Sequence, residues 1–401
     1  MREMKDSGIE WIGEIPKEWN IIPTKYCFTV NNGSDPTTND GDTPVYGSGS
    51  KSFKTCIEFK EGPTVLLGRK GTVNIPQWIE GRYWNVDTAF DVKPKGNYSL
   101  KFFYYTAICF DYENYSTQTA LPSMTQGNYL NIKLPYMPLP DQYRIANFLD
   151  AKCAEIDALS ADIQMQIDTL EQYKRSIITE AVTKGLNPDV EMKDSGNQYW
   201  GSIPTNWHLS DIKYLFEIIK RIAGKEGYDI LSVTQKGIKI KDISNNEGQV
   251  AESYANYQFV YPGDFVMNHM DLLTGWVDCS KLFGVTSPDY RVFRLRDKNN
   301  SLSYYKYIMQ TCYMNRIFYS LGQGVSNLGR WRLQTSSFNN FMVPVPPVEV
   351  QESIATYLDK KCTEINACID DKQRQLEVLE EYKKSLIYEY VTGKKEVPEN
   401  A

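Results

Sequence analysis

The sequence contains little that could form a Ser-His-Asp or Cys-His catalytic site. It has only two histidines, His208 and His269, so a Ser-His-Asp or Cys-His site would have to lie in the second half alone. Residues 188–193 contain a Pro-Asp pair and a Glu-x-Lys triplet, elements that metal-dependent nucleases take from separate strands. Because the two elements are contiguous here, we interpret the segment as a linker. We expect no catalytic residue and no metal ligand in this chain.

Motifs that bind nucleotide cofactors are also missing from the sequence. No G-x-x-x-x-G-K-[ST] loop occurs, which argues against ATP hydrolysis by a phosphate-binding loop. The N-P-P-Y tetrapeptide of adenine methyltransferases is absent, and the glycine pairs within residues 47–49 and 322–324 are too short to bind a methyl donor. The sequence therefore predicts a chain without a cofactor of its own.

Positive charge is concentrated in two segments, although the whole chain has a formal net charge of -6 at pH 7. Residues 51–101 contain nine basic and five acidic residues, and residues 291–332 contain eight basic residues against Asp297 alone. Lys and Arg provide most of the affinity of proteins for phosphate backbones. The local charge thus favours an anionic ligand. The alternative for both segments is an ordinary solvated surface.

Two stretches of the sequence occur twice. Glu-Met-Lys-Asp-Ser-Gly spans residues 3–8 and again 191–196, and the match extends as far as Phe28 and Phe216. A second pair begins at Ile145 and Ile354 and shares Ile-Ala, Leu-Asp, Lys-Cys, Glu-Ile and Leu-Glu-x-Tyr-Lys-x-Ser. The segments between them differ in length, and their sequences do not align. This order indicates a duplicated scaffold that carries two different inserts.

The second repeated stretch predicts a long helix in each half, over residues 145–184 and 354–393. Apolar residues recur there with the three-and-four spacing of a coiled-coil seam. The seams are Leu149, Ile156, Leu159, Ile163, Leu170, Tyr173 and Ile177, and Leu358, Ile365, Cys368, Leu379, Tyr382 and Leu386. Prolines precede both helices, and Gly185 and Gly393 are plausible stops. We expect the helices to pair as an antiparallel coiled coil; packing on their own domains, or a homodimer, is the alternative.

The inserts have the pattern of mixed α/β domains, so the predicted fold class is α+β with an internal repeat. Short apolar runs bounded by Gly, Pro, Asn and Asp are typical of strands. Such runs occur at residues 45–46, 64–67, 89–92, 265–267 and 341–343.

The cysteines and the hydropathy pattern predict a soluble cytoplasmic protein. Eight cysteines lie scattered without C-x-x-C spacing, which argues against a zinc ribbon or a disulfide framework and favours a reducing compartment. The repeated Cys153 and Cys362 fall in helical pattern and are expected to be buried thiols. No N-terminal apolar core of a signal peptide occurs, and no run approaches the roughly 18 apolar residues of a membrane span.

With these features the sequence resembles one family, the DNA specificity subunits of type I restriction-modification systems. A motif that opens each domain lies at residues 6–19, Asp-Ser-Gly-Ile-Glu-Trp-Ile-Gly-Glu-Ile-Pro-Lys-Glu-Trp, and its copy ends in Gly-Ser-Ile-Pro-Thr-Asn-Trp at residues 201–207. A motif that closes each domain combines prolines, a glutamine and Ile-Ala-x-x-Leu-Asp, ending at Asp150 and Asp359. Residues 67–71, 263–268 and 330–333 are similar to segments frequent within such domains.

The resemblance implies a domain layout and a set of partners. The layout is a target-recognition domain at residues 1–144, a spacer helix at 145–184, a linker and second target-recognition domain at 185–353, a second spacer helix at 354–393 and a tail at 394–401. The subunit would be non-catalytic and would read a bipartite target in double-stranded DNA, one half-site per domain, with the helices as a ruler. Two modification (methyltransferase) subunits and restriction (translocase and endonuclease) subunits would be its partners, and these would bind S-adenosylmethionine, ATP and Mg. No membrane contact is implied.

Eight residues are candidate DNA contacts within this interpretation. Arg69 and Lys70 lie between two glycines, which lets the backbone and a cation approach a phosphate or guanine O6 and N7. Asn268 can form two hydrogen bonds with adenine. The other candidates are the cations Lys51, Lys54, Arg291, Arg330 and Arg332. For each residue the alternative is plain surface charge or local turn chemistry.

Two other classes of function compete with this one. An enzyme with its own nuclease or methyltransferase activity is disfavoured by the missing motifs. An oligomerisation scaffold that does not bind DNA is favoured by the acidic composition, and sequence-selective binding that weakens with salt would exclude it.

Overall fold

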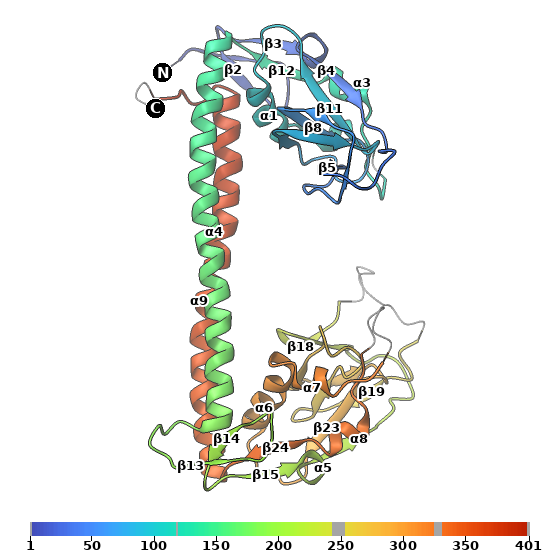
Figure 1. Cartoon of the computed structure of the whole chain (residues 1–401), viewed down its shortest axis with the longest axis vertical. Helices are drawn as coiled ribbons and strands as arrows, with labels where there is room; N and C mark the ends of the chain where they lie inside the picture. Colours follow the sequence, from blue (N-terminus) through green and yellow to red (C-terminus); the bar gives the residue numbers. More distant parts are fainter. Residues whose placement is uncertain (1, 118, 243–252, 325–330, 399–401) are drawn as a thin grey trace. The chain divides into compact units, whose positions relative to one another are not determined.

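The structure, a computed structural model, describes residues 2–117, 119–242, 253–324 and 331–398. It divides into two compact units, and each is described by itself. Unit 1 comprises Met1–Met165 and Lys372–Ala401, and unit 2 comprises Gln166–Asp371. The helices α4 (Leu139–Lys184) and α9 (Val348–Val391) contribute residues to both units (Figure 1).

Unit 1 folds around two small sheets. Its elements before α4 are β1 (Met4–Asp6), β2 (Glu14–Pro16), β3 (Asn20–Pro23), η1 (Thr24–Tyr26), β4 (Phe28–Asn32), β5 (Thr43–Tyr46), β6 (Lys54–Cys56), β7 (Lys60–Glu61), β8 (Thr64–Gly68), β9 (Gln77–Ile79), β10 (Arg82–Asn85), β11 (Ala89–Pro94), α1 (Leu100–Ile108), α2 (Tyr112–Tyr115), α3 (Gln126–Asn131) and β12 (Lys133–Tyr136). One sheet is antiparallel with the order β4-β11-β8-β9, and the other has the order β6-β5-β10-β7. Strands β3 and β12 form a separate pair that leads into α4.

Unit 2 contains the corresponding series of elements between α4 and α9. They are β13 (Met192–Asp194), β14 (Ser202–Pro204), β15 (His208–Asp211), α5 (Ile212–Leu215), β16 (Phe216–Ile219), β17 (Leu231–Thr234), β18 (Gly237–Ile240), β19 (Gln258–Val260), β20 (Phe265–Met267), β21 (Val277–Cys279), β22 (Gly284–Thr286), β23 (Arg291–Leu295), α6 (Leu302–Met314), α7 (Ile317–Ser320), α8 (Thr335–Asn339) and β24 (Met342–Val345). Its main antiparallel sheet has the order β16-β23-β20-β21.

The two units share one topology. Sheet order β4-β11-β8-β9 in unit 1 corresponds strand for strand to β16-β23-β20-β21 in unit 2. Hairpin β5-β6 corresponds to β17-β18, pair β7-β10 to β19-β22, and pair β3-β12 to β15-β24. The inserts do not align by sequence, yet they have the same order of elements. The predicted α+β class with an internal repeat is therefore confirmed, and the repeat extends through the inserts.

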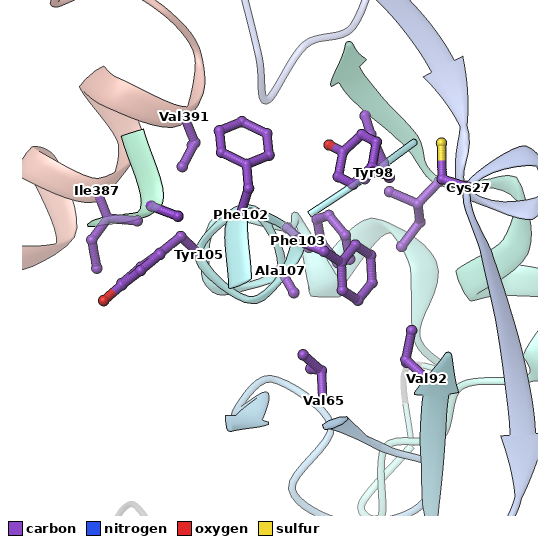
Figure 2. Close-up of a cluster of buried hydrophobic side chains, with 14 of the residues drawn as sticks. Cys27, Val65, Val92, Tyr98, Phe102, Phe103, Tyr105, Ala107, Ile387 and Val391 are labelled. Atoms are coloured by element: carbon purple, nitrogen blue, oxygen red, sulfur yellow. The ribbon is translucent and has the colours of Figure 1, made fainter. Parts of the chain in front are cut away.

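Helix α1 forms the centre of the unit 1 core (Figure 2). The Ser99 hydroxyl caps its first turn by accepting a hydrogen bond from Phe102 N. On one side the helix faces the sheet, which contributes Val65 and Val92, and on another it faces α9, which contributes Ile387 and Val391. Fully burying one such apolar side chain stabilises a fold by about 1.5–3 kcal/mol. The end of α9 is therefore an integral part of the unit 1 core.

The long helices pair in antiparallel orientation within each unit. In unit 1, the ring of Phe148 on α4 lies 4.6 Å from that of Tyr390 on α9, and Lys383 Nζ lies 2.6 Å from Asp157 Oδ1. In unit 2, Lys174 Nζ donates to Asn366 Oδ1 at 2.7 Å. The antiparallel pairing predicted from the matched seams is thus present in both units.

The helices depart from the prediction at their starts and along their seams. They have 46 and 44 residues and begin at Leu139 and Val348, before the predicted residues 145 and 354. Pro140 lies in the first turn of α4, where a proline is tolerated because its missing N–H needs no intrahelical partner. Helix α9 ends at Val391 rather than at 393. The predicted seam residues Leu159, Tyr173, Cys368 and Tyr382 are exposed, whereas Ile167 and Ile369 are buried. A helix with 3.6 residues per turn drifts about 20° per heptad from a strict 3.5 repeat, which moves these positions off the interface.

The cysteines and the helices bear on two further expectations. All eight cysteines are free thiols, and Cys153 and Cys362 are buried as predicted. Among the described residues, no helix combines the length and the apolar character that crossing a membrane requires.

Candidate nucleic-acid interface

The turn after β8 needs glycine at two positions. A Cβ on Gly68 would lie 2.3 Å from the carbonyl oxygen of Thr72, a distance that no other residue can accommodate. Gly71 has a φ of +82°, which is strained for residues with a side chain. The glycines on either side of Arg69 and Lys70 therefore permit this tight turn, and the two basic side chains project from it.

The turn is held by backbone hydrogen bonds to two other segments. Arg69 N donates to Thr88 O at 2.7 Å, and Met124 N donates to Arg69 O at 2.9 Å. Gly71 N donates to Pro122 O at 2.9 Å. The position of the turn is thus fixed by the main chain, and its side chains are not needed to hold it.

The cations of this region are available to a ligand. Lys51 and Lys70 are exposed and form no ion pair with any described residue. Arg69 Nη1 donates to Asp87 O at 3.2 Å and lies 3.8 Å from the Asp87 carboxylate, a partly exposed pair worth about 0–1 kcal/mol. Lys54 opens β6 beside the exposed Phe53 ring, whose centroid is 5.8 Å from its Nζ. A phosphate or a base could compete for all four side chains.

The segment before Lys51 lies against the turn. A Cβ on Gly71 would be 3.5 Å from Ser48 Oγ and 3.7 Å from Leu121 Cδ1. The structure therefore brings three segments together, residues 47–54, 69–71 and 121–124. All four unit 1 candidates lie on the first two of these.

In unit 2, Asn268 and His269 occupy the corresponding place after β20. The Asn268 carbonyl accepts a hydrogen bond from the Tyr313 hydroxyl at 2.8 Å, and its side-chain Oδ1 accepts one from Met270 N at 3.3 Å. His269 O accepts from Leu333 N at 3.0 Å, next to the exposed Arg332. Asn268 and Arg332 are thus brought together, but the Asn268 amide oxygen already has a local turn partner. Arg330 lies outside the described residues.

His269 is a further polar group in this region, and no sequence motif marks it as a candidate contact. Burial, together with the nearby Arg291 and Arg332 charges, lowers the pKa of His269 to about 4. Its Nδ1 is buried and has no partner among the described residues. The imidazole is therefore neutral at pH 7. The available signal was its position just beyond a buried β-strand, since His269 is the second residue after β20 and Arg69 is the first residue after β8.

Arg291 does not lie on the surface. Its side chain is only 4% exposed and donates to Leu333 O at 3.1 Å and Thr335 Oγ1 at 3.3 Å. The guanidinium carbon is 4.5 Å from the centroid of the Phe338 ring, and burial lowers the pKa of Arg291 to about 10. The predicted DNA contact through Arg291 disagrees with this burial. The residue instead joins β23 to the segment that leads into α8.

Several basic residues within residues 291–332 are also not available to a ligand. Arg294 pairs with Glu217 at 3.1 Å, and Lys306 pairs with Asp359 at 3.0 Å. Arg296 Nε donates to the carbonyls of residues 213 and 216. Among the described residues of the run, this leaves Lys298, Arg316 and Arg332 without an acidic or carbonyl partner for the side chain. Much of the predicted local charge is used to hold the fold.

The glutamine of each closing motif has a structural role. Gln142 is fully buried; its Oε1 accepts from Ser99 N at 2.7 Å, and its Nε2 donates to Met137 O at 2.9 Å. Gln351 accepts from Ser301 N at 3.0 Å and donates to Pro346 O at 3.0 Å. Each glutamine therefore ties the start of α1 or α6 to the start of a long helix. This explains why the motif repeats.

The aspartate of each closing motif and the tryptophan of each opening motif also have structural roles. Tyr105 donates to Asp150 at 2.6 Å, and Tyr307 donates to Asp359 at 2.6 Å. A Cβ on Gly393 would lie 2.9 Å from the Trp19 ring in unit 1. One on Gly185 would lie 3.3 Å from Trp207 in unit 2. The repeated motifs thus connect each insert to the helices, and the candidate contacts lie elsewhere in the inserts.

Clusters of titratable side chains bear on the question of catalysis. In residues 2–117, 119–242, 253–324 and 331–398, no group of three or more His, Cys, Asp or Glu side chains could hold a metal ion. A hollow of about 440 Å³ in unit 2 is lined by Arg175, Thr179 and Asn315, among others. These three side chains hydrogen-bond to one another at 2.9 and 3.0 Å. The hollow therefore presents polar side chains that already hydrogen-bond to one another.

Comparison with known families decides the classification. The profile of the family described as type I restriction modification DNA specificity domain matches residues 16–169 and 204–378. The chain belongs to this family. Each matched range covers most of one insert and part of a long helix, so the chain carries two specificity domains.

Two specificity subunits are similar to part of this chain. The type I restriction enzyme MjaVIII specificity subunit of Methanocaldococcus jannaschii is 25% identical over 297 residues, which are 69% of this chain and 65% of that protein. The putative type I restriction enzyme MjaX specificity subunit of the same organism is 23% identical over 288 residues, 68% of this chain and 61% of that protein. The match thus spans less than two thirds of each relative.

One solved structure has a similar fold over nearly the whole chain. That structure is described as the structural basis of complex assembly and conformational transition of the type I R-M system. It matches this chain with a TM-score of 0.66 at 14% identity. The alignment covers 95% of this chain and 99% of the other.

Proposed function

We propose that this chain is the DNA-recognition subunit of a type I restriction-modification complex and reads a bipartite target in double-stranded DNA, one half-site per unit. The observation that carries the proposal is that the two specificity domains share one topology but differ in chemistry at corresponding turns. Two copies of one scaffold with unlike polar surfaces are suited to two different half-sites.

The available cations supply the chemistry of binding. Lys51 and Lys54 in unit 1 would contact phosphates, which provides affinity without sequence information, and Lys70 in unit 1 and Arg332 in unit 2 add exposed positive charge. Arg69 and Asn268 stand in the turns after β8 and β20, where a side chain could reach a base edge. The net charge of -6 is compatible with this role because the acidic residues need not lie on the same surface.

The long helices supply the spacing in this proposal. A helix of 46 residues is about 69 Å long at a rise of about 1.5 Å per residue. The lengths of α4 and α9 would set the gap between the half-sites, as half-site spacing follows protein geometry in other two-site readers. Adding or removing helical turns would change the gap and leave the bases unchanged.

Repeated exposed residues on the helices support two equal partner subunits. The motif Leu-Glu-x-Tyr-Lys-x-Ser occurs at residues 170–176 and 379–385, and its tyrosines, Tyr173 and Tyr382, are 52% and 54% exposed. Internal packing does not explain why these two exposed tyrosines repeat. Two like surfaces fit two copies of a modification subunit, which would bind S-adenosylmethionine. Restriction subunits with ATP and Mg would complete the assembly in the cytoplasm.

The alternative is a scaffold whose paired helices mediate oligomerisation without DNA. To separate the two, the chain is co-purified with the modification subunit encoded beside it, and methyladenine is mapped genome-wide in cells with and without the pair. Loss of one bipartite methylated motif on deletion of this chain is the expected result. An unchanged methylome despite a stable complex would favour the scaffold.

A single substitution tests the site itself. Arg69→Ala is expected to weaken binding to the cognate duplex about tenfold, because one good bidentate base contact is worth about 1–3 kcal/mol. Lys298→Ala, a change of another exposed cation without an acidic partner among the described residues, should cost less than about twofold. Equal losses at matched salt would count against Arg69.

A further inference from the structure

The turn after β8 in unit 1 and the turn after β20 in unit 2 are held by the same backbone bonds. Met124 N donates to Arg69 O at 2.9 Å, and Leu333 N donates to His269 O at 3.0 Å. Two residues beyond Arg69, Gly71 N donates to Pro122 O at 2.9 Å. A similar bond in unit 2, three residues beyond His269, joins Leu272 N to Trp331 O at 3.2 Å. We call each arrangement the paired turn, residues 69–71 with 122–124 in unit 1 and 269–272 with 331–333 in unit 2.

A buried tyrosine fixes the base of each paired turn. The Tyr129 hydroxyl on α3 donates to Gly68 O at 2.7 Å, and the Tyr313 hydroxyl on α6 donates to Asn268 O at 2.8 Å. Both tyrosines are buried, although they come from helices that do not correspond in the repeat. The same carbonyl is therefore held in each unit by an unrelated side chain. The paired turn is a defined main-chain support whose exposed side chains can vary.

The exposed cation occupies opposite sides of the paired turn in the two units. In unit 1 the turn carries Lys70, and Ser123 faces it through an isolated antiparallel bridge. In unit 2 the turn carries Met270, and the facing segment carries the exposed Arg332. Neither Lys70 nor Arg332 forms an ion pair within the described part of the chain. The two units thus hold a comparable charge on the same support but on different strands of it.

We propose that the paired turn is the specificity-determining element of each unit, and that Lys70 with Ser123 and Arg332 with His269 select the bases of the two half-sites. This proposal rests on the proposed function and adds the positions that make the half-sites differ. A cation at these positions favours guanine, which offers O6 and N7 as acceptors in the major groove. A cation on the facing segment would therefore select a different base pair of the half-site from a cation on the turn.

The neutral partner at each position refines the selection. The Ser123 hydroxyl donates and accepts hydrogen bonds and so discriminates weakly between bases. The imidazole of His269 is uncharged at neutral pH because burial lowers its pKa to about 4, and in that form it offers one donor and one acceptor. Unit 2 therefore combines a fixed charge with a neutral group, whereas unit 1 has Arg69 at the position of His269.

The test is a binding selection from a randomised duplex library, with the full chain in complex with its modification subunits. Arg332→Ser removes the unit 2 cation, and the double change Lys70→Met with Ser123→Arg gives unit 1 the unit 2 arrangement. Each is expected to change base preference at least tenfold at a position in one half-site and to leave the other half-site unchanged. Lys298→Ala is the matched control and should change neither.

Three results are informative against the proposal or its basis. If the variants weaken all sequences equally and lower the dependence of log K on log salt by about one, Lys70 and Arg332 only contact phosphates, and the proposal fails. Arg332→Lys, which keeps the charge but loses the fork of donors, should shift the preference less than Arg332→Ser; no difference would also contradict it. If the unchanged complex enriches no bipartite sequence, the proposed function itself is wrong.

Discussion

Unit 1 and unit 2 show which parts of one fold must stay the same and which can change. Near the long helices they use the same side chains, a glutamine that binds the backbone at the start of α1 or α6 and a tyrosine that donates to an aspartate. Away from those connections the topology persists, but the residues differ. The two units therefore share both sequence and structure where the inserts join the long helices. On the variable surface they share the structure but not the sequence.

The same comparison explains how a fold survives such divergence. Strand pairing depends on backbone groups, so the order of strands tolerates almost any residue of suitable size and pattern. In the paired turn even the buried hydroxyl that holds the carbonyl is supplied by different helices. A surface supported in this way can change its chemistry without a change in its framework.

The largest expected effect comes from the two glutamines. Gln142→Ala leaves the buried Ser99 N–H and Met137 C=O without partners and should destabilise unit 1 by about 2–4 kcal/mol. Gln351→Ala should destabilise unit 2 by a similar amount. Hydrogen exchange of peptides from α1 and α6 measures the two units separately. The exposed Gln373→Ala is the control, and unequal losses for the two glutamines would weaken the equivalence of the units.

A difference in pH dependence should separate the units next. The folded pKa of His269, about 4, lies below its ordinary value of 6.5, so the unfolded state binds the proton more tightly. The contribution of neutral His269 to the stability of unit 2 is fully present above pH 6.5 and is lost as the pH falls toward 4. We expect the free energy of unfolding of unit 2 to fall by about 1–2 kcal/mol between pH 7 and pH 5, after allowance for partial exposure.

His269→Gln should remove this dependence, whereas His208→Gln, a change of the exposed histidine, should leave it intact. Urea unfolding at pH 7 and pH 5, followed by exchange in unit 2 peptides, provides the measurement. A dependence that persists in His269→Gln would assign it to other groups.

The tyrosine–aspartate bonds should give matched, smaller losses. Tyr105→Phe and Tyr307→Phe each remove one donor to a carboxylate that also has a lysine partner, Lys101 at 3.1 Å or Lys306 at 3.0 Å. We expect about 1–1.5 kcal/mol for each change. Thermal unfolding of the two variants, with Tyr143→Phe on the exposed face of α4 as control, tests whether the two bonds are equivalent.

The smallest effect concerns corresponding lysines on the helices. Lys383 pairs with the carboxylate of Asp157, whereas Lys174 donates to the amide of Asn366. Asn366→Asp should stabilise unit 2 by at most about 0.5 kcal/mol at low salt, and Asp157→Asn should cost unit 1 a similar amount. Both differences should vanish at 1 M salt; effects that persist there would not be electrostatic.

Much of the scaffold could be predicted from the sequence, because long helices have strong periodicity and the repeat is visible in identical residues. The shared topology of the inserts could not. Its strands have two to six residues, and their order depends on pairing between distant segments, such as Val30 with Val92. The seam prediction also failed at Leu159 and Tyr173, where helical drift outweighs the heptad pattern.

The candidate site was predictable only as a set of residue types. Lys51, Lys54, Arg69, Lys70 and Arg332 are at least partly exposed, and Arg291 is buried. Arg294 and Arg296 are occupied within the fold. An arginine carries no sequence signal for either fate, because long side chains can fold back onto the domain or extend into solvent. The relation between Arg69 and His269 became visible only through the strand order that precedes them.

The division of the chain has a consequence for its synthesis. Unit 2 is one continuous stretch, Gln166–Asp371, whereas the core of unit 1 includes Leu386, Ile387, Tyr390 and Val391 from beyond it. Although unit 1 is synthesised first, its apolar core is covered only after the last helix, α9, has been synthesised. Unit 2 can fold before that. Chains ending after Asp371 should show protease-resistant unit 2 and readily cleaved unit 1; equal resistance would refute this order of folding.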